Sequence, residues 1–297
     1  MDPTFTAVDL SRLPAPAVIE ELSFEAIYAA MLARLQELLP GFDATVESDP
    51  AVKVLQVAAY RELLLRQRIN DAARAVMPAY AVGADLDNLA ALMGVTRLEL
   101  SPADPDTNAP AVMESDADLR RRLVLAPEGF SVAGPAGAYI FHALSASGDV
   151  LDASATSPVP GQVIVTVLAR DGSGVPDAAL LDLVEAHVSD ENRRPLTDEV
   201  IVQAAQIVNY QIEATIKTFA GPDGSIVLAE AQRRIEEYIE LSHRLGRDIT
   251  RSAVLAALHC EGVQNVTLAS PAADIVVTRL QAPWCTALSV THAGLGE

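Results

Sequence analysis

A chain of 297 residues, half of them hydrophobic, is long enough for two or three domains and apolar enough to bury a sizeable core, which argues against wholesale disorder. Its formal net charge of −19 argues against a general nucleic-acid binder, because such a protein needs a positive surface to displace counterions from phosphates. The same negative charge argues against binding to anionic membrane surfaces.

The sequence shows no targeting or membrane-spanning segment. The first residues lack the basic and apolar regions of a signal peptide, and no run approaches the roughly 18 apolar residues of a transmembrane helix. Cys260 and Cys285 lack the spacing of a disulfide framework or a metal site, so we expect free thiols in a reducing cytoplasm.

Residues 1–17 are predicted to be extended, because Pro3, Pro14 and Pro16 forbid a regular helix and favour a polyproline-like arm. Such a segment is either a frayed terminus or an arm that lies on a neighbouring subunit. In the second case the contacts of the arm would come from Leu10, Leu13, Pro14 and Pro16.

A long helix is predicted over residues 51–77, which contain no Gly, no Pro and no turn cluster and would span about 40 Å. Asp49 can cap this helix, Pro50 suits its first position, and Pro78 marks its end. Shorter helices are predicted on either side, at residues 24–39, where Ser23 can act as the cap, and at residues 86–93.

One side of the long helix carries an apolar stripe at i+3 and i+4 steps, interrupted only by Glu62. An apolar stripe of this kind fits either an internal core helix of a bundle or a helix that packs on another chain. The stripe consists of Ala51, Leu55, Ala58, Leu65, Ile69, Ala72 and Val76.

Residues 101–110 are dense in Pro and Asp and are the best linker candidate in the chain. A helix is predicted to follow at residues 116–125. Arg120, Arg121 and Arg122 lie there among acidic residues, which favours a solvated or salt-bridged helix surface over a basic binding patch.

A first α/β unit is predicted after this helix, because the hydrophobic period changes at Gly148. Its strands are expected at residues 150–153, 163–168 and 200–202, and its helices at residues 135–145 and 177–189. Helices and strands in this order favour helices packed on one face of a small sheet.

A second, similar unit begins with the strongly alternating stretch at residues 207–219. Its helices are expected at residues 225–241 and 250–260, its further strands at 266–268 and 275–277, and a frayed tail from residue 291. Residues 143–158 and 257–271 form a weak internal repeat, for which common descent of the two units and chance similarity are both open.

The predicted fold is therefore α+β and multidomain. Residues 1–112 form an N-terminal extended arm and helical bundle region with the linker at 101–110. Residues 113–203 and 204–297 form two small, similar α/β domains with helices on a sheet.

The sequence offers no constellation for chemistry. It has no phosphate loop and no H-E-x-x-H motif, and neighbouring His259 and Cys260 would point about 100° apart on a helix. The acids are scattered and show no paired arrangement for acid–base catalysis. We therefore predict a protein that is not an enzyme, with no catalytic residues, no cofactor and no metal.

The chain resembles the baseplate J-like proteins of contractile-tailed phages and of phage-tail-like R-type bacteriocins. The resemblance extends along most of the sequence and is weaker in the last third. It is carried by VDLSRLPAP (8–16), LSFE (22–25), DPAVKVLQVAAYRELLLRQRIN (49–70), GADLDNLAALMGVTR (83–97), SDADLRRRL (115–123), SVAGPAGAY (131–139), VPGQVIVTVL (159–168) and RPLTDEVIV (194–202).

The resemblance implies a structural component of a baseplate wedge. Two copies of such a protein associate with a smaller wedge partner of the protein I type through a helical bundle. The α/β domains link neighbouring wedges into a ring around the central hub and spike, and a lysozyme-like wedge protein connects to the sheath. The ring transmits the trigger for sheath contraction and opens without losing its connections.

The resemblance also implies assembly in the bacterial cytoplasm and a final location in the baseplate of a virion or tail-like particle, without nucleic-acid binding or membrane insertion. It favours the long helix as a partner surface over a buried core helix. Two alternatives stay open, a soluble oligomeric adaptor unrelated to tails and a small-molecule enzyme on an α/β scaffold. A deep polar pocket would favour the enzyme.

Overall fold

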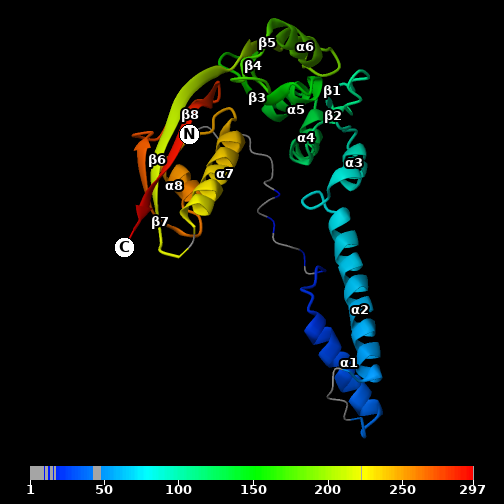
Figure 1. Ribbon diagram of the computed structural model, residues 1–297. Helices are drawn as coiled ribbons and strands as arrows, with labels where there is room; N and C mark the ends of the chain where they lie inside the picture. The colour runs from blue at the N-terminus through cyan, green and yellow to red at the C-terminus, as the bar shows by residue number, and fades with distance from the viewer. Residues whose placement is uncertain are drawn as a thin grey trace. The chain divides into compact units, whose positions relative to one another are not determined.

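The computed structural model describes residues 10, 13, 16, 18–42, 48–221 and 223–296. The chain divides into two compact units. Figure 1 shows the structure coloured by residue number from the N-terminus to the C-terminus. One unit is helical and lies within residues 6–96 and 115–124. The other contains residues 97–114 and 125–296 and holds the sheets, so the predicted α+β multidomain fold is confirmed.

The helical unit contains three helices that the sequence predicted, α1 (Phe24–Leu38), α2 (Pro50–Ala75) and α3 (Gly83–Ala91). Both expected side-chain caps are present. The Ser23 hydroxyl accepts a hydrogen bond from the backbone N–H of Ala26 at 3.2 Å, and the Asp49 carboxylate accepts one from the N–H of Ala51 at 2.7 Å. These caps fix where each helix begins.

Helix α4 (Asp116–Gly129) begins in the helical unit and carries arginines that bind main-chain carbonyls there. Arg120 donates to the carbonyl oxygens of Pro78 and Ala81 at 2.7 and 2.6 Å, beyond the end of α2. Arg122 is buried and donates to the carbonyl of Thr96 at 2.5 Å. Of the two expected environments, a solvated or a salt-bridged helix surface, the solvated one is wrong for Arg122, because its side chain is buried and binds a backbone carbonyl.

Residues 99–113 form a small hairpin of strands β1 (Glu99–Ser101) and β2 (Val112–Met113). The segment expected to be a linker, residues 101–110, makes up the end of this hairpin, where Asp104 and Ala109 form a β-bridge. The Asp104 carboxylate accepts hydrogen bonds from the Thr107 hydroxyl and the Asp106 N–H, which hold its pKa below the usual value.

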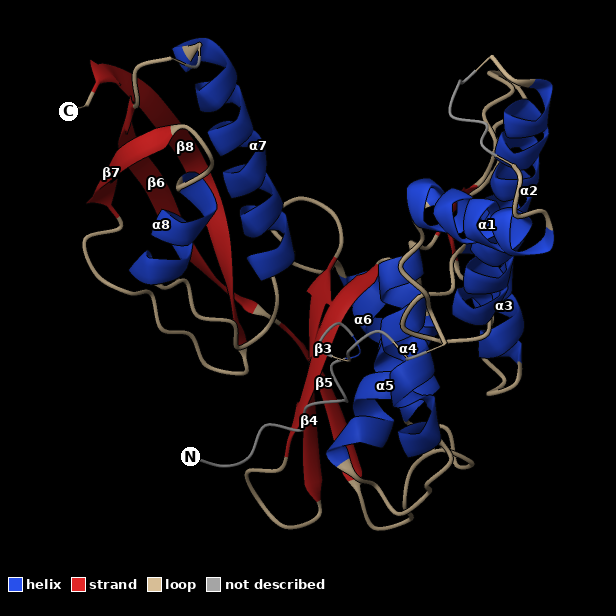
Figure 2. Ribbon diagram, turned by 90° about the horizontal axis from the view of Figure 1, so that it is seen from below, coloured by secondary structure: helices blue, strands red, loops and turns tan. Residues whose placement is uncertain are grey.

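The first α/β domain places two helices on one face of a three-stranded sheet (Figure 2). The strand order is β3-β4-β5; β3 and β4 are antiparallel, and β4 and β5 are parallel. Its elements are α5 (Ala136–Ala146), β3 (Val150–Thr156), β4 (Gln162–Ala169), α6 (Ala178–Val188) and β5 (Glu199–Ala204). Its core includes Val165, Val167, Val184 and Val188.

The second α/β domain has the same kind of sheet, in the order β7-β6-β8, again with one antiparallel and one parallel pairing to the central strand. Its elements are β6 (Gln206–Thr218), α7 (Gly224–Ser242), α8 (Arg251–Leu258), β7 (Val263–Ser270) and β8 (Gln281–Leu295). Ile212 and Ile216 of β6 face Ala231 and Ile235 of α7 and Val254 of α8 in its core.

Two expectations for the end of the chain are wrong. Residues 275–277 were expected to form a strand, but only Ile275 makes a bridge, to Ile249. The tail from residue 291 was expected to fray, but β8 continues to Leu295 because it pairs with β6 along its length. Among the described residues, no helix combines the length and the apolar character that a membrane crossing requires.

The two α/β domains meet at a joint with buried polar contacts. Strand β6 begins after a single residue, Ala205, at the end of β5. Asp152 is 3% exposed and accepts a hydrogen bond from the backbone N–H of Leu245 at 2.9 Å. Arg244 donates to the carbonyl of Leu151 at 3.0 Å, and the Ser154 hydroxyl donates to the carbonyl of Arg279 at 2.7 Å.

Candidate interface on the helical hairpin

Helices α1 and α2 form a hairpin with very little core of its own (Figure 1). Helix α1, which the structure describes throughout, has no buried residue. Helix α2 buries only Val52, Ala59 and Asn70 over its 26 residues. A pair of helices gains most of its stability from packing an apolar face. In this hairpin few side chains of α1 and α2 are buried, so the two helices gain little stability from packing on each other.

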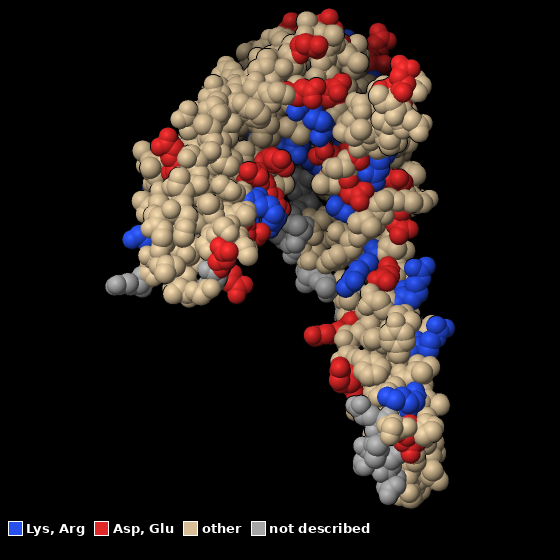
Figure 3. All heavy atoms as spheres, viewed as in Figure 1, with Lys and Arg blue, Asp and Glu red and all other residues tan. Residues whose placement is uncertain are grey.

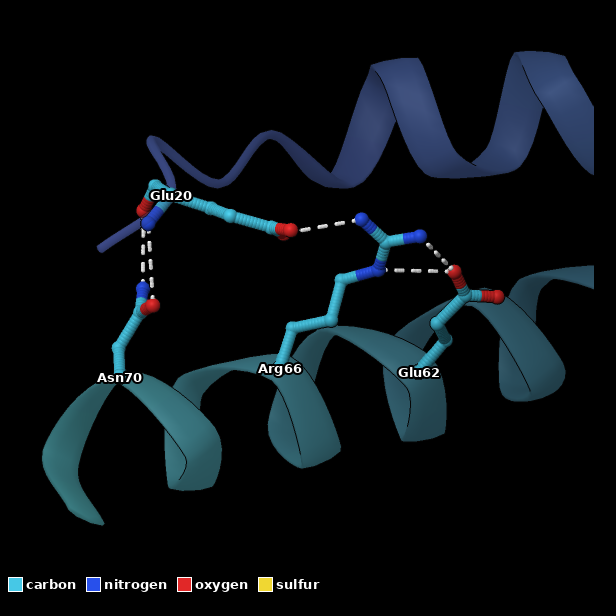
Figure 4. Close-up of polar contacts among 4 residues, drawn as sticks. All are labelled: Glu20, Glu62, Arg66 and Asn70. Atoms are coloured by element: carbon cyan, nitrogen blue, oxygen red, sulfur yellow. Dashed lines mark hydrogen bonds and ion pairs between the residues drawn. The ribbon is translucent and has the colours of Figure 1, made fainter. Parts of the chain in front are cut away.

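Polar contacts fix how the segment before α1 lies against α2 (Figure 4). The side-chain amide of Asn70 accepts from the backbone N–H of Glu20 at 3.0 Å and donates to the carbonyl of Glu20 at 2.8 Å. Arg66 bridges to Glu62 at 2.8 Å and to Glu20 at 3.0 Å. The hydrogen bonds that Arg66 donates to Glu62 and then to Glu20 raise the pKa of Arg66, which stays positively charged.

The predicted stripe does not face α1. Leu65, Ile69 and Val76 are 63%, 60% and 67% exposed. Ala58 and Ala72 are also exposed, whereas Ala51 and Leu55 are half-buried. From Ala58 onward the stripe is therefore an apolar face of α2 that the described residues leave exposed, and α1 packs against a different side of the helix.

Sequence reasoning missed two members of the same exposed surface. Val54 and Val57 are 68% and 64% exposed on α2. Val54 lies four residues before Ala58, so the i+4 step could have placed it beside the stripe. The predicted stripe did not include Val54, because it began with Ala51 and Leu55, which lie closer to the half-buried side of the helix.

A groove of about 430 Å³ lies between the first half of α1 and the middle of α2. Its lining combines apolar and charged side chains. The apolar residues are Leu22, Ala26, Ile27, Ala30 and Met31, and the charged ones are Glu21, Arg34, Glu62 and Arg66. Charges at an apolar groove favour an amphipathic helix over a small reacting molecule.

The predicted arm is only partly within the described residues. Leu10 and Pro16 are half-buried, and Leu13 is exposed while its carbonyl accepts a hydrogen bond from the Tyr80 hydroxyl at 3.3 Å. Pro14 lies outside the described residues. Contacts of this arm with a neighbouring subunit stay a prediction.

His142 of α5 and His187 of α6 lie close together, with ring centroids 6.2 Å apart. Burial and the positive charge of Arg193 lower the pKa of both rings, that of His187 to about 4. Both are therefore neutral near pH 7. Within the described ranges, no three His, Cys, Asp or Glu side chains gather closely enough to hold a metal ion.

Three family models match successive parts of this chain. They are the Baseplate J-like N-terminal domain over residues 47–104, the Baseplate J-like central domain over 131–204 and the Baseplate J-like protein C-terminal domain over 210–291. Because these matches cover more than half of the sequence, the chain belongs to the Baseplate J-like family.

The chain is also similar to "Baseplate protein J" of Escherichia phage P2, with 50% identity over 299 residues that cover 98% of this chain and 99% of that protein. Among solved structures it is similar to a chain of the anti-feeding prophage (AFP) baseplate, determined by cryo-EM with 6-fold symmetry. That match has 14% identity and a TM-score of 0.41, and covers 59% of this chain and 44% of that chain.

Proposed function

We propose that this chain is a structural component of the baseplate of a contractile tail, in a phage or a phage-tail-like bacteriocin. The observation that carries the proposal is the 50% identity to a baseplate protein J along nearly the whole of both sequences. The chain is made and assembled in the bacterial cytoplasm and ends in the particle, without binding nucleic acid or entering a membrane. It has no catalytic role and needs no cofactor.

Within the baseplate the chain is a wedge protein. Two copies associate with a smaller wedge partner of the protein I type, and their α/β domains form a ring around the central hub and spike. A lysozyme-like wedge protein connects this ring to the sheath, and the ring transmits the trigger for contraction. Two α/β domains supply two different surfaces, as a closed ring requires of each subunit.

The hairpin of α1 and α2 is the part that enters the wedge bundle, with the stripe as its seam. The support is physical, because a protein rarely leaves several large aliphatic side chains exposed in one row on a single helix. Burying one side chain such as Leu65, Ile69 or Val76 in a bundle contributes about 1.5–3 kcal/mol. The seam consists of Ala51, Leu55, Ala58, Leu65, Ile69, Ala72 and Val76.

Leu65→Asp tests the seam. The side chain is exposed in the chain alone, so the variant keeps its fold and thermal stability while a carboxylate at the seam prevents the bundle from forming. We expect the variant to be absent from particles when it replaces the wild-type gene in the producing strain. Incorporation is measured by electron microscopy and mass spectrometry of purified tails.

Tyr60→Asp is the matched control, because Tyr60 is also exposed on α2 but lies on another side of the helix. It should enter particles as the wild type does. Normal incorporation of Leu65→Asp, or equal loss for both variants, would show that the stripe is not the seam. A wild-type chain missing from purified tails would contradict the baseplate role itself.

A further inference from the structure

A buried histidine lies at the joint between the two α/β domains. His243 is the residue at which α7 ends, and it is 7% exposed. Its Nδ1 lies 2.7 Å from the carbonyl oxygen of Pro283, near the start of β8. Because a carbonyl oxygen can only accept, Nδ1 carries the hydrogen of the neutral ring, and Nε2 is left with a lone pair that can bind a proton.

The first α/β domain covers this second ring nitrogen. Nε2 of His243 is buried and has no hydrogen-bond partner among the residues that the structure describes. Gly174, on the turn after β4, packs against it so closely that an added Cβ would lie 2.9 Å from Nε2 and closer still to Cδ1 of Leu168. A buried polar atom without a partner is uncommon in a native protein and calls for a physical explanation.

The charged residues around the ring are placed or bonded elsewhere. Strand β8 contains no Asp, Glu, Lys or Arg, and few charged side chains lie over β6 and β8 on the face shown in Figure 3. In the first domain, Asp152 accepts from two backbone N–H groups and Asp171 is exposed. Arg170 and Arg244 donate to backbone carbonyls, and Glu240 is exposed. In the described part of the chain, no charged side chain bonds to the ring.

A proton on Nε2 would destabilise this arrangement. It adds an N–H donor and a positive charge at a place where the described residues provide no acceptor, and an unpaired buried charge costs far more than an unpaired acceptor. When the turn at Gly174 moves away from the ring, water reaches Nε2 and accepts from it. The open joint therefore binds the proton more readily than the closed joint, so acid favours the open joint.

We propose that the contact between His243 and Gly174 is a proton-sensitive switch between the two α/β domains. The turn packs on the ring while Nε2 is unprotonated, and protonation of Nε2 releases it. The switch acts between about pH 5 and pH 8, where an imidazole changes its charge. This inference goes beyond the proposed function and is independent of it, because it concerns a contact within one chain.

Trp284 reports on this contact directly. It is the single tryptophan of the protein, and its ring centroid lies 5.0 Å from that of His243. Tryptophan emission moves to longer wavelength when water reaches the indole ring. We expect the emission of the full-length protein to move to longer wavelength as the pH is lowered from about 8 to about 5, while the far-UV circular dichroism stays unchanged.

His243→Asn tests the role of the ring nitrogen. Asparagine keeps an N–H donor for the Pro283 carbonyl but has no group that binds a proton in this pH range. We expect this variant to lose the emission shift. His259→Gln is the matched control, because it removes an exposed histidine and should keep the shift.

Two glycines of one turn give a second test that leaves the histidine in place. Gly174→Ala places a methyl group against Nε2 and Leu168, so its emission should already be at longer wavelength at about pH 8. Gly172→Ala is the matched control. Both glycines have a positive φ, 60° at Gly172 and 90° at Gly174, but a Cβ at Gly172 meets no atom within 4 Å. This control should keep the emission and the pH response of the wild type.

Wild-type emission that stays constant over this pH range, or an equal shift in His243→Asn, would overturn the proposal. So would equal emission from the two glycine variants, which decide the question if His243→Asn does not fold. A shift accompanied by loss of the far-UV signal would also overturn it, because the chain would then unfold instead of opening at the joint. The baseplate role is tested separately, by incorporation into particles.

Discussion

Asn70 is the residue on which the packing of α1 against α2 depends most directly. It is 3% exposed and uses both ends of its side-chain amide to bind the backbone of Glu20. When a side chain that binds an N–H and a C=O of one residue at once is removed, both backbone groups lose their partner. Asn70 therefore holds the entry to α1 in one position.

Asn70→Ala should weaken the attachment of α1 by about 1–3 kcal/mol, because the N–H and the carbonyl of Glu20 lose their partner. Native-state hydrogen exchange should show faster exchange of the α1 amides and unchanged exchange in the α/β domains.

Gln67→Ala is the control, since the Gln67 amide donates to exposed Asp71 on the same helix and bonds to no other residue that the structure describes. Exchange rates in α1 that do not change in Asn70→Ala would mean that Arg66 and apolar contacts hold the segment without it.

The helix caps show how far single residues could be predicted. Ser23 and Asp49 were identified as caps from residue type and position alone, and the structure has both hydrogen bonds. The role of Asn70 could not be predicted, because its partner, Glu20, lies 50 residues away. The same limit applies to Arg120 and Arg122, which bind the carbonyls of Pro78 and Thr96, 42 and 26 residues away in the sequence.

At the scale of elements, the order of strands is what the sequence did not reveal. The two α/β domains were predicted to be similar, and each sheet does have a central strand with one antiparallel and one parallel neighbour. In the first domain the antiparallel edge strand β3 precedes the central strand β4. In the second domain the central strand β6 comes first and the antiparallel edge strand β7 follows two helices.

The internal repeat therefore covers a local segment and not a whole domain. Residues 143–158 and 257–271 both contain the end of a helix, a Gly and an edge strand antiparallel to the central strand. Local patterns determine a helix end and an edge strand, but the position of the central strand depends on long-range pairing. The stripe on α2 was identifiable for the same reason, since it is a local pattern, whereas the side that α1 covers was not.

The contact between His142 of α5 and His187 of α6 leads us to predict that the stability of the fold depends on pH. In the folded protein His187 has a pKa of about 4, below the ordinary value of 6.5, because of burial and the charge of Arg193, and the pKa of His142 is also lowered. Between these pH values the unfolded chain binds more protons than the folded one, so stability falls as pH falls from about 6.5 towards about 4.

Thermal denaturation followed by circular dichroism should show this loss, and His187→Gln should reduce its slope. His259→Gln serves as the comparison, because it removes an exposed imidazole at the end of α8, outside the contact between α5 and α6. Equal slopes in the wild type and His187→Gln would assign the acid sensitivity to other groups.

The contacts at the joint between the two α/β domains lead us to predict that these domains unfold together. Asp152 is buried and accepts from the backbone N–H groups of Leu245 and Ala153, and Arg244 and Ser154 add contacts across the joint. Loss of one partner of a buried carboxylate network is strongly destabilising, because the remaining groups stay desolvated.

Asp152→Ala should therefore split or broaden the calorimetric unfolding transition of the α/β domains, whereas the wild type unfolds them in one transition. Asp149→Ala is the control, since among the described residues the Asp149 carboxylate accepts a hydrogen bond from the nearby Ser147 hydroxyl at 3.1 Å and none from the second domain. Separate transitions already present in the wild type would show that the joint does not couple the domains.

The passage from β5 to β6 through the single residue Ala205 has a mechanical consequence. The two strands form one backbone path that enters both sheets, and each is held by a parallel neighbour, β4 on one side and β8 on the other. Tension applied along this path loads those ladders in shear, so many hydrogen bonds resist at once instead of opening one after another. A pull on either sheet thus reaches the other through covalent bonds, with no loop in between to stretch.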